Sequence, residues 1–288
     1  MLISPVRGRR SGMLLAGGLL LGLSGCGGLR NVLDLERPSA RIVGVSLRDV
    51  SLDAATLLFD VDVENPYAVP LPLLNVDYGL ASADKPFLSG KADLQGTVPA
   101  RGKKSVSVPA KVTYLELLRT LKDVRPGSVV PYKGELGLSV DAPAVGLLRL
   151  PLEKEGKLPV PAAPGVKITE VKWDTLTLDE AGGRVTVQLV NHNQFPVELA
   201  GLTYALALGD VEVAKSSMAK AVAFEAGGGA GTIEIPISLS PKKLGLAAFR
   251  VLAGEGAGYK LLGTANVDTP FGAMSLPIEG IGNTVFRR

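Results

Sequence analysis

The chain has 288 residues, of which 46% are hydrophobic and 20% charged, so it can bury a substantial core and global disorder is excluded. Aromatic residues make up 5%, whereas the 35 Gly and 20 Pro are abundant, a mixture typical of short strands joined by turns. One Cys and one His exclude an intrachain disulfide framework and a zinc finger, and leave little material for Cys/His or Ser/His/Asp catalysis.

The formal net charge of +3 comes from the first 25 residues. They contain three arginines and no acidic residue, and without them 28 basic residues balance 28 acidic ones. A neutral body gives no support for a nucleic-acid partner or for a polybasic membrane binder.

The N-terminal segment has the layout of a secretory signal. Arg7, Arg9 and Arg10 precede the apolar run 13–23, which is too short to span a bilayer as a helix. The ending Leu-Ser-Gly-Cys at 23–26 resembles a bacterial lipobox. It predicts a signal peptide over 1–25, lipidation with palmitate-type acyl chains at Cys26 and a tether over 26–41. An ordinary signal peptide with an incidental Cys and a short membrane anchor are the alternatives.

The residue after the lipobox bears on localisation. Gly27 stands where an Asp commonly signals retention in the inner membrane. By resemblance to that sorting rule, we expect anchoring in the outer membrane, facing the periplasm. The expected partner is then the membrane itself, reached through the lipid.

The rest of the chain contains a tandem repeat of one unit. A shift of 126 places Asn65 on Asn191, Pro70 on Pro196 and Tyr78 on Tyr204, and later matches continue in the same order with a one-residue slip. The charged, proline-containing stretch between the copies predicts a semi-extended linker. We therefore expect one domain over 42–152, a linker over 153–167 and a second domain over 168–288.

Each copy is predicted to be mostly β, with one short helix. Period-two alternation of apolar and polar residues indicates strands over 57–64, 105–108, 135–141, 184–190 and 232–235. A capping-box pattern at 113–116 predicts a helix in copy one, and Ser240-Pro241 predicts the start of one in copy two. The fold class expected is two tandem antiparallel β-sandwiches.

Two matching segments carry a family resemblance. Residues 63–72 (VENPYAVPLP) with 76–80 (VDYGL), and 190–197 (VNHNQFPV) with 202–206 (LTYAL), resemble the late embryogenesis abundant type 2 family, whose domain is also called WHy. The resemblance covers 42–152 and 168–280. It implies a fibronectin-like sandwich with a short helix, and the motif residues Asn65, Pro66, Pro70, Tyr78, Asn191, Pro196 and Tyr204. Copy two departs from the motif in carrying His192 where copy one has Pro66.

The candidate chemical groups each have a structural interpretation that we favour. His192 is expected to be a solvated turn residue, and Asn65 and Asn191 are expected to shape turns through side-chain bonds to backbone. The glycines at 227–229 indicate a hairpin loop rather than a phosphate loop, and Trp173 a core or rim aromatic. Asp60, Asp62 and Glu64 share one face of a predicted strand. A solvated sheet face is favoured there over a cation site because Thr186, Gln188 and Val190 replace them in copy two.

No active site is assembled by these residues, so the sequence predicts a non-enzymatic lipoprotein without cofactor or metal. The resemblance implies a role in tolerance of water deficit or related stress. Two alternatives remain open. One is a structural or assembly module of the envelope that docks partners through sheet edges or the apolar faces of Leu73 and Leu199. The other is a carrier holding an apolar ligand between its sheets.

Overall fold

The alternating strands predicted from sequence build two sandwiches, each with its own core. The computed structural model describes residues 36–143, 145–219 and 221–287. The first core is formed by residues between Ala55 and Val160, the second by residues between Ile168 and Ile278. The chain from Pro38 onward forms one compact unit. The mostly-β prediction is confirmed, and the predicted lipobox and signal peptide lie outside the described residues.

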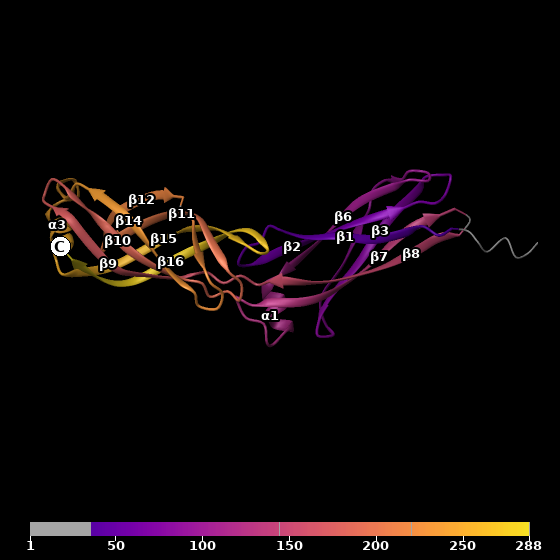
Figure 1. The fold of residues 1–288 in the computed structure, drawn as a ribbon, viewed down its shortest axis with the longest axis horizontal. Coiled ribbons are helices and arrows are strands. Elements are labelled where there is room, and N and C mark those ends of the chain that lie inside the picture. Colours follow the sequence, from indigo (N-terminus) through magenta and orange to yellow (C-terminus); the bar gives the residue numbers. More distant parts are fainter. Residues whose placement is uncertain (1–35, 144, 220, 288) are drawn as a thin grey trace, which may run out of the picture. The chain divides into compact units, whose positions relative to one another are not determined.

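The first sandwich packs a three-stranded sheet, in the order β1-β2-β6, against a sheet in the order β4-β3-β7-β8, with β5 paired to β3 (Figure 1). Its elements are β1 Ser39–Arg48, β2 Ala54–Glu64, β3 Leu71–Ser82, β4 Lys85–Asp93, β5 Thr97–Val98, β6 Lys103–Thr113, α1 Tyr114–Thr120, β7 Val129–Ala142 and β8 Gly146–Pro159. Along β2, every second residue from Ala55 to Val63 is buried, which is the alternation expected of a strand with one wet face.

The second sandwich repeats this order, and its strands form one continuous sheet, β12-β11-β15-β16-β9-β10-β14, with β13 paired to β11. Its elements are β9 Gly165–Leu176, β10 Ala181–Val190, β11 Val197–Leu208, β12 Val211–Met218, β13 Val222–Phe224, β14 Ala230–Leu239, α2 Pro241–Leu244, α3 Leu246–Leu252, β15 Gly256–Thr269 and β16 Gly272–Arg287. Continuity arises because the end of β16 pairs in parallel with β9.

The helix predictions need two corrections. In copy two the helix is divided into α2 and α3, because Gly245 between them has φ 92, which no α-helix tolerates. In copy one the helix starts where predicted, yet the Thr113 side chain makes no capping hydrogen bond. The Thr113 N-cap has extended backbone, so the capping-box pattern marked the boundary without forming its reciprocal bonds.

The predicted tether and linker are both shorter in the structure. Strand β1 begins at Ser39, inside the expected tether. Strand β8 continues to Pro159, so 153–159 pair with β7, and only 160–164 lie between β8 and β9. The charged residues 153–155 and 157 are exposed, yet they lie on a strand paired with β7, and this pairing cannot be predicted from breakers and charge alone. Val160 is 1% exposed and belongs to the first core.

Cross-strand glycines accommodate large side chains on the sheets. Tyr132 on β7 lies over Gly156 of β8, and Tyr259 on β15 lies over Gly282 of β16, at matching positions of the two copies. Arg149 likewise crosses Gly137 to form an ion pair with Asp77, and this hydrogen-bonded guanidinium holds the pKa of Asp77 below its usual value. A Cβ at any of these glycines would overlap the side chain above it.

The β3–β4 hairpin contains a strained turn that can be relieved. Ser82 pairs with Lys85, so Ala83 and Asp84 form a two-residue loop, and both have positive φ, 46° and 62°. Such a turn favours Asn-Gly, because alanine in the left-handed region costs about 1 kcal/mol. We expect Ala83→Asn with Asp84→Gly to raise the free energy of unfolding by about 1 kcal/mol in urea denaturation. Ala83→Val should lower it, and equal stability of the two variants would contradict the assigned turn.

Candidate functional site

The asparagine turn of the first copy is held by one buried side chain. The Asn65 amide, 1% exposed, donates to the carbonyl oxygens of Val69 (2.8 Å), Val98 (3.2 Å) and Pro99 (3.0 Å). Its Oδ1 accepts from the backbone N–H of Tyr67 at 3.0 Å. The carbonyls belong to two chain segments, 65–70 between β2 and β3, and 98–99 at the end of β5, where the chain leads to β6. These are places where the chain passes between the two sheets.

The second copy repeats this turn at identical sequence offsets. The Asn191 amide donates to the carbonyls of Phe195 (2.8 Å), Phe224 (3.5 Å) and Glu225 (3.0 Å), which lie 4, 33 and 34 residues further along, as in copy one. Its Oδ1 accepts from the N–H of Asn193 at 3.0 Å. The shared offsets make the turn a property of the repeated unit rather than of one sandwich.

The glycine-rich segment 227–229 closes the second turn. Gly228 donates its N–H to the Asn191 carbonyl at 2.8 Å, and the Gly229 carbonyl accepts from Asn191 at 2.9 Å. The hairpin predicted here is wrong: the segment joins β13 to β14, which pair with different strands, β11 and β10. Gly227 and Gly228 have φ 70 and 107, so glycine is required by the backbone path around Asn191.

In copy two, residues that follow Asn191 form hydrogen bonds with the segment between the copies and with the first sandwich. Asn193 Oδ1 accepts from the N–H of Ala162 at 2.8 Å, and its Nδ2 donates to the Ala162 carbonyl at 3.3 Å. The Gln194 backbone N–H donates to Gly127 at 2.7 Å, and its Oε1 accepts from Val129 at 3.2 Å. Tyr67 and Ala68 stand at the equivalent positions of copy one, so these side-chain contacts are specific to the second turn.

The motif tyrosines differ in their surroundings. Tyr204 is 4% exposed on β11, and burial raises the pKa of its hydroxyl while a hydrogen bond to Ser216 opposes that shift. Tyr78 is half-buried on β3 and lies against Gly90 of β4. Pro70 and Pro196 are exposed, and Pro66 is half-buried. The two tyrosines thus lie within strands, opposite residues of neighbouring strands, rather than in the turns.

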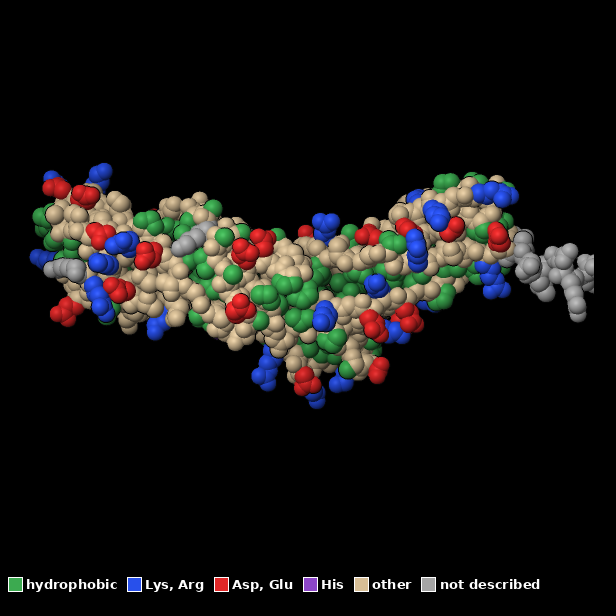
Figure 2. Space-filling model, viewed as in Figure 1, with side chains coloured by type: hydrophobic (Ala, Val, Ile, Leu, Met, Phe, Trp, Pro, Cys, Tyr) green, Lys and Arg blue, Asp and Glu red, His purple; other side chains and the backbone are tan. Residues whose placement is uncertain are grey.

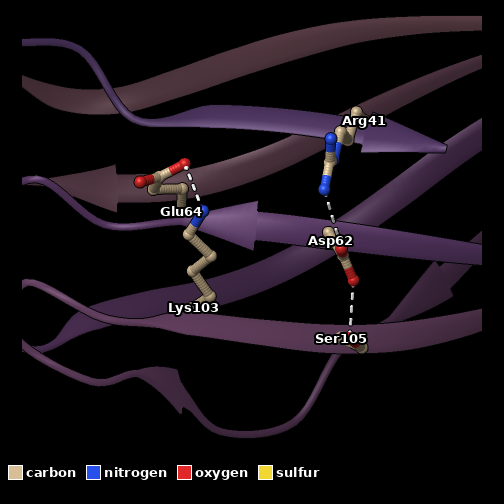
Figure 3. Close-up of polar contacts among 5 residues, drawn as sticks. All are labelled: Arg41, Asp62, Glu64, Lys103 and Ser105. Carbon is tan, nitrogen blue, oxygen red and sulfur yellow. Dashed lines mark hydrogen bonds and ion pairs between the residues drawn. The ribbon is translucent and has the colours of Figure 1, made fainter. Parts of the chain in front are cut away.

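The three carboxylates of β2 form part of a paired polar surface (Figure 3). Asp62 accepts from Ser105 at 2.6 Å and forms an ion pair with Arg41 at 3.5 Å, and Glu64 pairs with Lys103 at 3.3 Å. Asp60 accepts from Ser107 at 2.6 Å. Each carboxylate thus has a protein partner. Within the described residues, no group of three His, Cys, Asp or Glu side chains is arranged to hold a metal ion.

The side chains of two other residues noted in the sequence take no part in the hydrogen bonds of the asparagine turns. The His192 side chain is exposed in the second turn. Trp173 is 3% exposed in the second core, where its ring meets Phe286 edge-on at 5.9 Å, and its Nε1 has no hydrogen-bond partner. The sequence missed Asn193, whose position after an exposed His gave no signal of burial; it is 1% exposed.

The burial of apolar residues bears on the carrier and docking alternatives. An apolar pocket beside Asn191 and Phe224, between the sheets of the second sandwich, has a volume of about 20 Å³, far too small for an acyl chain. Leu73 and Leu199, proposed as docking faces, are 4% and 1% exposed. That interpretation is wrong, because both side chains point inward from β3 and β11 into the cores.

These features define a duplicated β-sandwich protein in which the repeated residues hold the fold. A family model described as late embryogenesis abundant protein matches residues 60–156 and 186–280. The chain belongs to this family, the late embryogenesis abundant type 2 proteins. Membership assigns it a stress-related function of the LEA type 2 kind. No helix in the described part of the chain combines the length and hydropathy needed to cross a membrane.

Two curated relatives each align over most of their own length with less than half of this chain. The desiccation protectant protein Lea14 homolog of Glycine max is 33% identical over 130 residues, 45% of this chain and 86% of its own length. The desiccation-related protein PCC27-45 of Craterostigma plantagineum is 32% identical over the same shares. Neither is named for a catalysed reaction. The solution structure of AT1g01470 from Arabidopsis thaliana matches with 28% identity and a TM-score of 0.37, covering 44% of this chain and 84% of that one.

The buried asparagines should control stability. We expect Asn65→Ala or Asn191→Ala to lower the free energy of unfolding by about 2–4 kcal/mol, because each removes a buried amide that bonds three buried or part-buried carbonyls. Urea denaturation followed by circular dichroism measures the change. Asn75→Ala is the matched control, since Asn75 is half-buried on β3. A loss no larger than that of the control would show that the turns are held by the backbone alone.

The hydrogen bonds from Asn193 to Ala162 should protect the segment 160–164 from proteolysis. We expect Asn193→Ala to speed proteolytic cleavage within 160–164, because Ala162 then loses both of its side-chain hydrogen bonds. Limited proteolysis with mass spectrometry locates the cut, and His192→Ala serves as control from the same turn. An unchanged cleavage rate in Asn193→Ala would mean that burial of the flanking Val160 suffices.

Proposed function

We propose that this chain is a lipid-anchored envelope protein that protects the cell against desiccation or related stress. The observation that carries the proposal is that both copies match the family, while relatives named for desiccation are covered over 86% of their length by less than half of this chain. The lipobox-like ending at Cys26 adds the anchor, and Gly27 after it favours the outer membrane facing the periplasm.

The mechanism we propose depends on folded surfaces rather than on a reacting group. The outer face of β2 and β6 carries carboxylates, hydroxyls and cations paired with one another, so it presents a hydrated polar surface. Exposed pairs of this kind contribute little to stability, about 0–1 kcal/mol each. Their effect is to keep polar groups at the surface. A folded polar domain beside a leaflet could keep neighbouring proteins or lipids apart as water is removed.

Docking through sheet edges, the alternative function, is restricted by proline. Pro109 on β6 and Pro236 on β14 occupy edge strands of the two copies at equivalent positions. Proline lacks the N–H that a partner strand needs, and it blocks continuous pairing along an edge. A docking function would therefore use the remaining edges, such as β12, and no feature of that strand specifies a partner.

The anchor is tested by removing the thiol. We expect Cys26→Ala to lower the membrane-bound fraction of the protein and to reduce survival of drying when the variant complements a deletion strain. Fractionation, mass spectrometry of the mature protein and viable counts after drying measure the three effects. Unchanged mass and fractionation would overturn the lipid anchor. Normal drying survival of the deletion strain itself would overturn the protective function.

The non-catalytic mechanism is tested at the titratable groups. We expect His192→Ala, and separately Asp60→Asn with Asp62→Asn, to complement the deletion strain fully, because protection by a folded surface needs no acid, base or nucleophile. Thermal melts confirm that each variant is folded. A stable His192→Ala protein that fails to complement would make the second turn a functional site.

A further inference from the structure

The two copies differ where their sheets meet along one side. In the second sandwich, Phe286 and Arg287 at the end of β16 pair with Val171 and Lys172 of β9, so the two sheets are joined. The Phe286 ring also packs edge-on against Trp173. This side of the second core is therefore covered by backbone pairing and by aromatic side chains.

The same side of the first sandwich stays open. The shift of 126 matches Phe286 with Val160, and both residues make the same backbone bond, Val160 to the Ser128 carbonyl and Phe286 to the Glu255 carbonyl, each at 2.9 Å. The difference is that β8 ends at Pro159, whereas β16 continues through Phe286 into its pairing with β9. Strands β1 and β8 belong to different sheets, with no ladder between them along the described residues. We call the interval between β1 and β8 the open seam.

A hollow of about 680 Å³ lies in the open seam, within the range of about 300–1,000 Å³ typical of small-molecule sites. Its apolar lining comes from Val45 and Leu47 of β1, Leu57 of β2, Tyr132 of β7 and Phe271 of the β15–β16 turn. Leu57 and Tyr132 are core residues, so the hollow reaches down to the first core. Figure 2 shows hydrophobic side chains running along the first sandwich, with both basic and acidic side chains beside them.

The rim of the hollow is cationic. Arg48, Lys154 and Lys157 line it and are exposed, against one acidic residue, Glu155. None of these three cations has an ion pair within the described residues, whereas neighbouring Lys133 bridges Glu135 and Glu153 at 3.1 and 3.0 Å. Three unpaired cations around an apolar floor are complementary to a ligand with an anionic head and an apolar tail.

From this charge and shape we propose that the open seam binds a long-chain fatty acid, its tail on the apolar floor and its carboxylate among Arg48, Lys154 and Lys157. An inserted peptide strand is disfavoured by the spacing. Cα atoms of β1 and β8 approach within 8 Å, whereas a strand paired to both would hold them about 9.5 Å apart. The site goes beyond the protective function.

Binding is tested with cis-parinaric acid, a fluorescent long-chain fatty acid, on the full chain. We expect saturable binding that Lys154→Glu with Lys157→Glu weakens by about tenfold or more, since two attractive charges become repulsive. Lys111→Glu with Lys260→Glu is the matched control: both lysines are exposed on strands outside the hollow and give the same change in net charge. Thermal melts establish that both variants are folded.

The competing ligand chemistries give distinct results. Displacement of the probe by palmitate but only weakly by the uncharged alcohol of equal length supports recognition of the carboxylate, and failure of acetate to compete supports burial of the tail. Absence of saturable binding, equal weakening in the control variant, or equal competition by the alcohol would each overturn the proposal. Because the readout is binding rather than survival, this site and the protective function can fail separately.

Discussion

One buried amide in each sandwich holds together the points at which the chain changes sheets. Asn65 reaches carbonyls in the β2–β3 turn and at β5 and just beyond it, and Asn191 does the same in the second copy. A sandwich of this topology must cross between its layers, and the crossings expose backbone groups that neither sheet can pair. An asparagine has both donors and an acceptor on a short side chain, so it satisfies both crossings at once.

The asparagine turn of the second copy also binds the segment that connects the two copies. In copy one the residues after the asparagine are Pro66 and Tyr67, whereas in copy two they are His192 and Asn193, and Asn193 bonds both to Asn191 and to Ala162. The same backbone turn thus shapes a sandwich in one copy and also fixes the incoming connection in the other. The connection itself is short because β8 extends to Pro159, and its buried Val160 belongs to the first core. The two repeats are consequently joined by a short segment, 160–164, that is hydrogen-bonded to the second sandwich.

The sequence predicts the parts of this structure that are governed by local periodicity. Alternation along 57–64 and 184–190 identifies β2 and β10, and the matched Asn65 and Asn191 identify equivalent turns, because both signals reside in neighbouring residues. What it misses depends on residues far apart in the chain. Leu73 and Leu199 are read as exposed faces until the opposite sheet is in place, and the charges of 153–157 suggest a linker until β7 is beside them. For the carboxylates of β2 the sequence favours a solvated sheet face, but it does not identify their partners, Arg41, Lys103, Ser105 and Ser107, which lie on other strands.

The two copies differ in whether their sheets are joined on one side. In the second copy the end of β16 pairs in parallel with β9, so the two sheets are continuous there. In the first copy β8 ends at Pro159, and no ladder joins it to β1 along the described residues. The first copy therefore keeps uncovered apolar surface between β1 and β8 that the second copy buries. Such surface costs stability when it faces water alone, at about 25 cal/mol per Å². A ligand that covers it would recover that cost, so the duplication itself creates an asymmetry between a closed sandwich and one suited to binding.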